Sequence, residues 1–282
     1  MQNVASTALK GDAKPAPAGI DRAELEHATP HAVRMSIRSG RWRGNTKRLA
    51  LGHYQANVII VQERYAFDFM RFCMRNPKPF PLMDVTDAGD PVPRRLAPDA
   101  DLRTDVGDYS VFRDGKLIEC VPDLTKHWRS DHVAFLTGCG MSLGRVMEEA
   151  RISIPEDVSP KYITGVQCTP AAFFHGPLVM TMRAVPNDLV LRITELTSRY
   201  ALCHGGPTHL GDPAAIGIKD LNQPNWGKPL QVPAGYTAMF NACGLTSHAV
   251  AMACGLPEMI MQTVGRMLIT DIPVTESYST NF

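Results

Sequence analysis

The sequence has no run of 18 apolar residues, the length a helix needs to cross a bilayer. It also lacks the N-terminal basic-then-apolar pattern of a secretory signal. Its 29 Lys and Arg residues balance 28 Asp and Glu residues, and it has three tryptophans and no basic patch. With a net charge of +1, no strong field attracts nucleic acid or an anionic membrane surface. We therefore expect a cytoplasmic protein with neither a nucleic-acid nor a membrane partner.

Several motifs of well-known enzyme classes are absent. There is no Walker A loop, no Gly-x-Gly-x-x-Gly after a strand, no His-Glu-x-x-His and no Gly-x-Ser-x-Gly. These absences remove support for nucleotide-binding proteins, zincins and α/β-hydrolases. The seven cysteines are widely spaced and include no Cys-x-x-Cys pair, which disfavours a thiolate zinc site and a redox dithiol. We expect them to be free thiols.

The pattern of apolar residues predicts an α/β fold. A chain of 282 residues, 44% hydrophobic and 20% charged, can bury a large core. Residues 1–20 are rich in Ala, Pro, Gly and Lys and predict a disordered tail. Strand and helix patterns then alternate between short Gly/Pro loops, which favours helices layered on a mixed sheet. No linker marks a clean boundary, so we expect a smaller domain, residues 126–224, inserted into a main domain of residues 21–125 and 225–282.

Local signals define the expected elements. Helices are predicted at His31–Arg38 after the cap Thr29-Pro30, at Arg64–Arg75, after a Ser142 cap, from an Asn187 cap to Tyr200, and from Thr246. In Arg64–Arg75, apolar residues recur at helical spacing at Phe67, Met70 and Met74, with Phe69 and Cys73 beside them. Strands are predicted at Val58–Val61, Tyr109–Val121 (a hairpin turning at Asp114-Gly115), Val133–Leu136, Pro177–Val185, Thr237–Cys243, Met259–Thr263 and Met267–Ile272.

The segment His204–Pro213 reads His-Gly-Gly-Pro-Thr-His-Leu-Gly-Asp-Pro and carries the first candidate site. Glycine and proline fix the backbone, so His204, His209 and Asp212 are candidate catalytic groups held in a stiff loop. An imidazole can exchange protons near neutral pH, and a carboxylate can orient it. The alternative is a tight turn whose histidines satisfy backbone groups. The residue types also suit a metal, but no further ligand cluster supports one, so we expect no metal.

A second candidate lies where the apolar run Val133–Leu136 meets Gly138-Cys139-Gly140. This loop precedes a predicted helix, whose free N–H groups favour anions and thiolates. Cys139 is therefore a candidate catalytic residue, and Gly138 and Gly140 are candidate substrate-binding positions. The alternative is a small residue at a crowded turn, and we favour Cys139 as a group that lines the site over Cys139 as a nucleophile.

Three further residues are candidates for binding an anionic substrate. Arg183 ends a predicted strand, and Arg103 lies in a polar loop between Asp101 and Asp105. Arginine binds carboxylates through two parallel hydrogen bonds. For Arg103 a structural salt bridge is the favoured alternative. Asn57 offers an amide before a strand, with turn capping as its alternative.

An ordered set of segments resembles one family. It is the D-glutamate cyclase family, also called the YcsI-like hydro-lyases, and the resemblance runs from about residue 30 to residue 273. The matching runs are Gln55–Asn57, Arg75–Pro79, Asp101–Asp105, Phe135–Cys139, Gly176–Arg183, His204–Pro213, Ile216–Asp220, Ala242–Gly244 and Met267–Asp271. Each run is weak alone, and the ordered set is specific.

The resemblance implies a fold and a reaction. The fold is α/β with two domains, one a three-layer sandwich and the other a smaller two-layer unit. The chemistry is that of a carbon–oxygen lyase, and the family's named activity is cyclisation of D-glutamate to 5-oxo-D-proline with loss of water. No cofactor is established for the family. The expected partner is therefore a small carboxylate substrate, and base rates suggest a homodimer.

The chain departs from the family pattern at two places, which indicates a divergent member. Relatives read Gly-Cys-Ser-Phe-Ser-Phe-Glu where this chain has Gly138–Gly144, so Gly144 replaces an acid. Relatives read His-Ala-Pro-Gly-His where this chain has Gln262–Arg266, so two histidines are missing. These losses keep open an alternative function, in which the protein binds a small carboxylate or lactam, or serves as a partner subunit, without turnover.

The resemblance and the candidate residues together give a mechanistic hypothesis. Arg183 or Arg103 anchors a carboxylate, and His209, oriented by Asp212, takes a proton from the substrate ammonium. His204 later protonates the leaving oxygen. Amides near Gly138–Gly140 stabilise the oxyanion.

Overall fold

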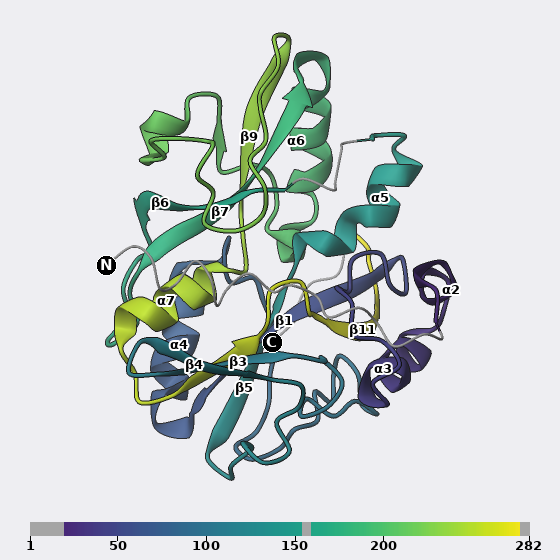
Figure 1. The fold of residues 1–282 in the computed structure, drawn as a ribbon, viewed down its shortest axis with the longest axis vertical. Coiled ribbons are helices and arrows are strands. Elements are labelled where there is room, and N and C mark those ends of the chain that lie inside the picture. Colours follow the sequence, from purple (N-terminus) through teal and green to yellow (C-terminus); the bar gives the residue numbers. More distant parts are fainter. Residues whose placement is uncertain (1–19, 154–158, 277–282) are drawn as a thin grey trace.

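The computed structural model describes residues 20–153 and 159–276, which form two β-sheets with helices on their faces (Figure 1). The predicted tail, residues 1–20, lies outside the described residues except for Ile20. The larger sheet has seven strands in the order β2-β5-β1-β10-β3-β4, with β11 also paired to β1. Its strands are β1 (His53–Gln62), β2 (Leu82–Val85), β3 (Tyr109–Arg113), β4 (Lys116–Val121), β5 (His132–Gly138), β10 (Met259–Gln262) and β11 (Leu268–Pro273).

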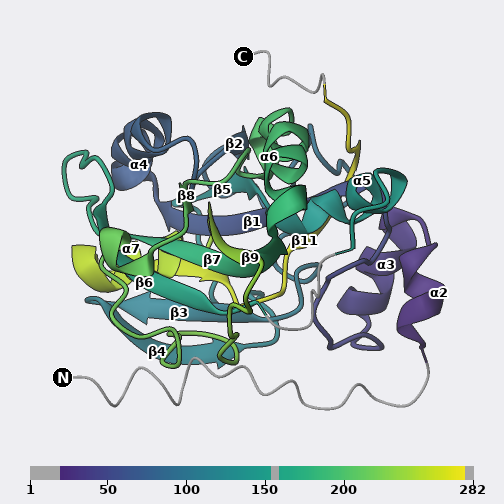
Figure 2. The same cartoon turned by 90° about the horizontal axis from the view of Figure 1, so that it is seen from above.

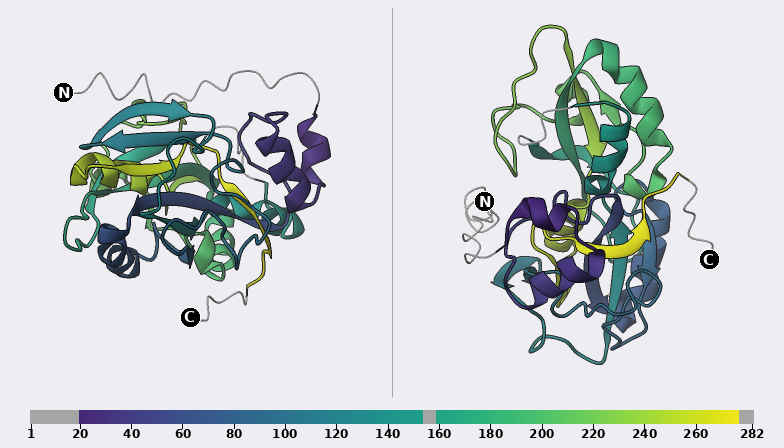
Figure 3. Two further views of the ribbon diagram at one scale, coloured as in Figure 1. Left: turned by 90° about the horizontal axis from the view of Figure 1, so that it is seen from below. Right: turned by 90° about the vertical axis from the view of Figure 1, so that its right-hand side faces the viewer.

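The smaller sheet has four strands in the order β6-β7-β9-β8. They are β6 (Lys161–Gln167), β7 (Pro177–Pro186), β8 (His209–Leu210) and β9 (Tyr236–Ala242). Figure 1 and the right-hand view of Figure 3 show this sheet and α6 (Val190–Ser198) in the upper part of the molecule, above the larger sheet.

The α/β fold class is confirmed, but the sheets are not mixed. Each pairing among the described strands is antiparallel. Short apolar runs reveal burial but not strand direction, which is why the sequence did not distinguish the two arrangements.

Five further helices and four 3₁₀ turns complete the described elements. The helices are α2 (Arg22–Glu26), α3 (Pro30–Arg38), α4 (Glu63–Arg75), α5 (Gly144–Glu149) and α7 (Thr246–Cys254). The turns are η1 (Gly140–Leu143), η2 (Asn187–Leu189), η3 (Ala201–Cys203) and η4 (Pro213–Ile216). Figure 3 shows α2 and α3 together at one end, and Figure 2 shows α4 across the larger sheet from the β3–β4 hairpin. None of the described helices is long and apolar enough to cross a membrane.

Several local predictions are confirmed and three are wrong. Thr29 caps α3 by accepting a hydrogen bond from the Ala32 N–H, as expected. In α4, however, Phe69, Phe72 and Cys73 form the buried face, whereas Phe67 and Met74 are 68% and 70% exposed. The helix therefore turns a different apolar stripe to the core from the one its spacing suggested.

The other two wrong predictions are the helix caps Ser142 and Asn187, whose side chains make different contacts. The Ser142 hydroxyl accepts a hydrogen bond from the Gln55 backbone N–H at 2.9 Å, so it ties η1 to β1. Asn187 begins the η2 turn, and its side chain accepts a hydrogen bond from Thr237 at 2.8 Å.

The two sheets share one hydrophobic core. Ile59 and Phe135 of the larger sheet, Phe69 of α4, and Met182 and Phe240 of the smaller sheet belong to the same buried cluster. The predicted domain limits, 126–224, remain a prediction. By sheet membership, a smaller unit would begin near β6 and end near β9, because β5 belongs to the larger sheet.

Candidate active site

A polar row crosses one face of the smaller sheet. Strand register pairs Lys161 of β6 with Thr181 of β7, and Thr181 with Asn241 of β9. Directly paired residues share a face, and every second residue of a strand returns to it. Arg183 therefore joins this face, and its guanidinium donates to the Asn241 side chain at 3.4 Å. Three strands thus bring an amine, a guanidinium, a hydroxyl and an amide together.

Apolar clusters bound this row at both ends. Val185, on the same face of β7, packs with Ile193 of α6. Val179, which faces the same way nearer the start of β7, packs with Leu245, just before α7, and with Ala249 of α7. The row therefore lies within a sheltered stretch of the sheet.

Two thiols reach the row from loops that follow strands. Cys139 follows β5 of the larger sheet, and Cys243 follows β9 of the smaller sheet. The pKa of Lys161 is lowered, chiefly by burial; the Arg183 and Lys47 charges lower it further, and the two thiols act in the opposite direction. The amine, the guanidinium and both thiols therefore lie near enough for their charges to act on one another.

Asn57 of β1 contacts both loops that carry the thiols, the one with Cys139 and the one with Cys243. Its amide donates to the Gly138 carbonyl at 2.9 Å and to the Thr137 carbonyl at 3.3 Å. Its oxygen accepts a hydrogen bond from the Gln262 side chain at 2.7 Å. A Cβ at Gly244 would lie 2.5 Å from the Asn57 amide, so this loop also rests on it. The contacts of Asn57 are those of a positioning residue; the predicted substrate contact stays a prediction.

His204 is buried beside this group with a fixed tautomer. Its Nδ1–H donates to the Lys78 carbonyl at 2.7 Å, which leaves Nε2 as an acceptor. Burial lowers the pKa of His204 to about 4, and the nearby Arg183 charge acts in the same direction. A Cβ at Gly140 would lie 3.8 Å from the His204 ring, so the two loops touch. His204 is therefore a neutral acceptor at neutral pH, not the proton donor that the sequence suggested.

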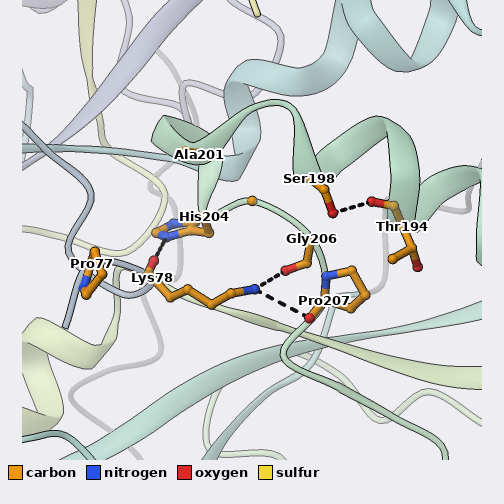
Figure 4. Close-up of a pocket in the computed structure, with 9 residues that line it drawn as sticks. Pro77, Lys78, Thr194, Ser198, Ala201, His204, Gly206 and Pro207 are labelled. Atoms are coloured by element: carbon orange, nitrogen blue, oxygen red, sulfur yellow. Dashed lines mark hydrogen bonds between the residues drawn. The ribbon is translucent and has the colours of Figure 1, made fainter. Parts of the chain in front are cut away.

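His204 also lines a cavity of about 370 Å³ between α6 and the loops around it (Figure 4). The Lys78 amine closes one side by donating to the Gly206 carbonyl at 2.5 Å and the Pro207 carbonyl at 3.4 Å. The lining residues are Pro77, Lys78, Thr194, Ser198, Ala201, His204, Gly205, Gly206 and Pro207. A cavity of this size accommodates a small organic acid.

The loop Gly138–Gly140 is built for close packing. A Cβ at Gly138 would lie 1.8 Å from the Leu202 carbonyl oxygen, so only glycine fits. The Gly138 N–H is bound to the Pro81 carbonyl at 2.9 Å and is not available to an oxyanion. Burial raises the pKa of Cys139 to about 12, and a thiol protonated at neutral pH is a poor nucleophile. The segment after Cys139 is a 3₁₀ turn and a six-residue helix, not the anion-binding helix start that was expected.

His209 and Asp212 do not join this group. His209 pairs with Phe240 across β8 and β9, and their ring centroids lie 5.8 Å apart. Arg183 pairs with Met239, the neighbour of Phe240, and adjacent residues of a strand face opposite sides. The His209 ring donates to the Asp212 backbone carbonyl at 2.7 Å, while the Asp212 carboxylate accepts from the Ala214 N–H at 2.9 Å. The predicted carboxylate–imidazole contact is therefore wrong, and His209 lies on the other face of the sheet.

Arg103 is held within its own loop. Its guanidinium donates to both carboxylate oxygens of Asp101, at 2.9 and 2.7 Å. Its carbonyl accepts from the Leu124 N–H at 2.8 Å. Arg103 thus makes the structural ion pair that the sequence allowed as its alternative.

The positions of the missing histidines are occupied by structural groups. Besides Asn57, the Gln262 side chain binds the Val58 backbone N–H at 2.8 Å. Arg266 pairs with Asp108 at 2.9 Å. At Gly144, where an acid was expected, a Cβ would lie 3.1 Å from Leu51.

The sequence analysis did not identify Lys161 as a site residue, and it included Cys243 only within the family-like segment Ala242–Gly244. Nothing around Lys161 in the chain marks it, because its partners Arg183 and Asn241 come from other strands. The one available signal was a cationic residue at the start of a half-buried strand.

Comparison with known proteins defines the class. A sequence profile described as D-glutamate cyclase matches residues 133–271. A "Putative hydro-lyase YcsI" from Bacillus subtilis is 44% identical over 248 residues, 86% of this chain and 96% of that protein. The chain belongs to the D-glutamate cyclase family.

Other relatives carry the same kind of name. A "Putative hydro-lyase" from Rubrobacter xylanophilus is 45% identical, covering 85% of this chain and 94% of the relative. Another from Dinoroseobacter shibae is 42% identical, covering 88% and 84%. Among solved structures, a nitrogen repressor-like protein from Methanococcus jannaschii aligns over 82% of this chain and 91% of that one, with 9% identity and a TM-score of 0.36, too low to support an argument.

Proposed function

We propose that this protein is a hydro-lyase that removes water from a small carboxylic or amino acid at the Lys161–Arg183–His204 site. The observation that carries the proposal is the convergence of a guanidinium, an amine, a neutral imidazole and two thiols from both sheets, with the imidazole of His204 also lining a small cavity. The relatives' names and the family description support the reaction class. The first substrate to test is D-glutamate, with 5-oxo-D-proline as the product.

Cyclodehydration of glutamate has three requirements. One carboxylate must be held, the ammonium must become a neutral amine, and the second carboxylate must lose an oxygen as water. Arg183 suits the first task because a guanidinium binds a carboxylate through two hydrogen bonds, and the Asn241 side chain orients it.

The neutral His204 suits the binding of the substrate ammonium. Its Nε2 is an acceptor, because Nδ1 is committed to the Lys78 carbonyl. The Gly138 amide is occupied, so stabilisation of the tetrahedral oxyanion comes from the cationic side chains. Loss of one such donor typically costs about 3–4 kcal/mol of transition-state stabilisation.

The test is a screen of D-glutamate, L-glutamate and small hydroxy and oxo acids, with mass detection of a product lighter by one water. We expect turnover of at least one acid by the wild-type protein and a large loss in Arg183→Met. Arg183→Lys keeps the charge but not the paired hydrogen bonds, so it should fall between the two. Absence of any dehydration product, with the protein folded, would contradict the proposal.

A second candidate function is binding without turnover. It is favoured by Gln262 and Arg266, which hold Asn57 and Asp108 where the family pattern has histidines. In that case an acid or lactam would raise the melting temperature without forming product. The same screen, read by thermal shift, separates the two functions.

A further inference from the structure

We propose that Lys161 is the proton-transfer residue of this site, taking protons from the substrate ammonium and delivering them to the departing carboxylate oxygen. This inference rests on the proposed function and assigns the base that His209 was expected to provide. It concerns a residue that neither the sequence patterns nor the family resemblance singled out.

The position of Lys161 is the first reason. Its side chain starts on the same sheet face as that of Arg183, the proposed carboxylate anchor. Lys161 pairs with Thr181, which lies two residues before Arg183 on β7. A hydrogen bond from its amine to the Ser159 carbonyl at 2.7 Å orients the end of the side chain. A substrate held by Arg183 would therefore place its second polar end near this amine.

The charges around Lys161 are the second reason. Four groups from other parts of the fold act on it: Arg183 from β7, Lys47 from the loop before β1, Cys139 after β5 and Cys243 after β9. Burial chiefly, and the two cations in addition, lower the pKa of Lys161 against the opposite effect of the thiols, so the amine loses its proton more readily than that of an exposed lysine.

The other titratable groups of the site are less suited to this task. The pKa of His204, about 4, makes it a weak base, and the pKa of Cys139, about 12, keeps its thiol protonated. His209 lies on the opposite face of the sheet. Lys161 is the group whose pKa is shifted toward the pH at which a protein works.

One amine can carry out both of the proton transfers that the reaction requires. Lys161 first takes a proton from the substrate ammonium, and the freed nitrogen attacks the carboxylate carbon. Lys161 then returns that proton to one oxygen of the tetrahedral intermediate. It next takes a second proton from the attacking nitrogen and delivers it as the carbon–oxygen bond breaks. The products are a neutral lactam and one water, and Lys161 ends as the amine with which it began.

The first experiment does not depend on any substrate. The folded protein is labelled with acetic anhydride across a pH series, and peptide mass spectrometry compares Lys161 with the exposed Lys219. We expect the reactivity of Lys161 to rise at lower pH than that of Lys219. A midpoint equal to or above that of Lys219 would overturn the inference whatever the protein catalyses.

The second experiment uses the substrate found by the dehydration screen. Lys161→Ala should lower kcat by about 10²–10⁴-fold, and added methylamine should restore part of it. Lys161→Arg keeps the charge but cannot take a proton at neutral pH, so it should stay as slow as Lys161→Ala. Lys219→Met is the matched control and should keep the wild-type rate.

The outcomes separate the two proposals. If Lys161→Arg keeps the wild-type kcat and pH profile, the residue acts only through its charge and the inference is wrong. If the wild type turns over no acid, the proposed function is wrong, and the labelling series alone decides whether Lys161 is a neutral amine.

Discussion

Two buried neutral histidines should make the fold sensitive to mild acid. His204 and His248 are 4% and 0% exposed, and burial lowers the pKa of each from 6.5 to about 4. Nε2 of His248 has no hydrogen-bond partner among the described residues, and the ring packs edge-on against Phe112. Neither imidazole therefore gains a proton readily in the folded state.

The sign and size of the pH effect on folding stability follow from the difference in proton uptake between the folded and unfolded states. Below pH 6.5 the unfolded chain takes up protons that the folded chain refuses, so stability is full above that pH and falls as the pH drops toward about 4. Each pKa unit is worth about 1.4 kcal/mol, so each histidine costs about 2 kcal/mol by pH 5. Two of them remove about 4 kcal/mol between pH 7.5 and pH 5, a large share of a typical folding free energy. Carboxylates, which titrate near pH 4 in unfolded chains, contribute little in this window.

Urea unfolding of the wild type, His248→Leu and His175→Gln at both pH values measures this directly. His248→Leu should lose about half of the pH dependence, because leucine fills the apolar site without titrating. His175 is exposed, so His175→Gln should behave as the wild type does. If His248→Leu keeps the full pH dependence while folded, the imidazole is not the titrating group and the reasoning fails.

Three other substitutions test the site. Arg183→Met should raise KM for the substrate about 10–100-fold, read from steady-state kinetics, because a charge-assisted contact is worth about 1.5–3 kcal/mol; an unchanged KM would remove the anchor. Gly138→Ala should lower the unfolding free energy by at least about 3 kcal/mol in urea, since its Cβ would meet the Leu202 carbonyl at 1.8 Å; near-wild-type stability would show that the loop relaxes. His209→Ala should leave kcat within about threefold of wild type if His209 is not the base, and a loss of about 100-fold or more would restore the sequence-based assignment.

Signals confined to a few neighbouring residues predicted the structure well. The Thr29-Pro30 cap and the Asp114-Gly115 turn each specify a local geometry, and both are present. Whether two strands run parallel or antiparallel depends on which segments pair, and no single segment of the sequence specifies its partner. The α4 face was misjudged for a similar reason: Phe67 and Phe69 are equally apolar, and only the core beside the helix decides which is buried.

The site was predicted in part. Glycine-rich loops pointed to Cys139 and His204, and the two loops do touch at Gly140. His209 is only five positions from His204, yet the backbone has entered β8 by then and the pleat turns its side chain to the far face. Lys161 joins the site through cross-strand register alone, and no spacing within the chain encodes that.

The backbone at His204 bears on why an imidazole is there at all. Its φ of 71° is left-handed, a conformation that glycine adopts without strain and that a side chain makes less favourable. A glycine would satisfy the backbone angle, but it could not supply the buried ring or its hydrogen bond to the Lys78 carbonyl. The ring therefore offsets the strain of the bend, and a library that randomises this position under selection for activity should return histidine.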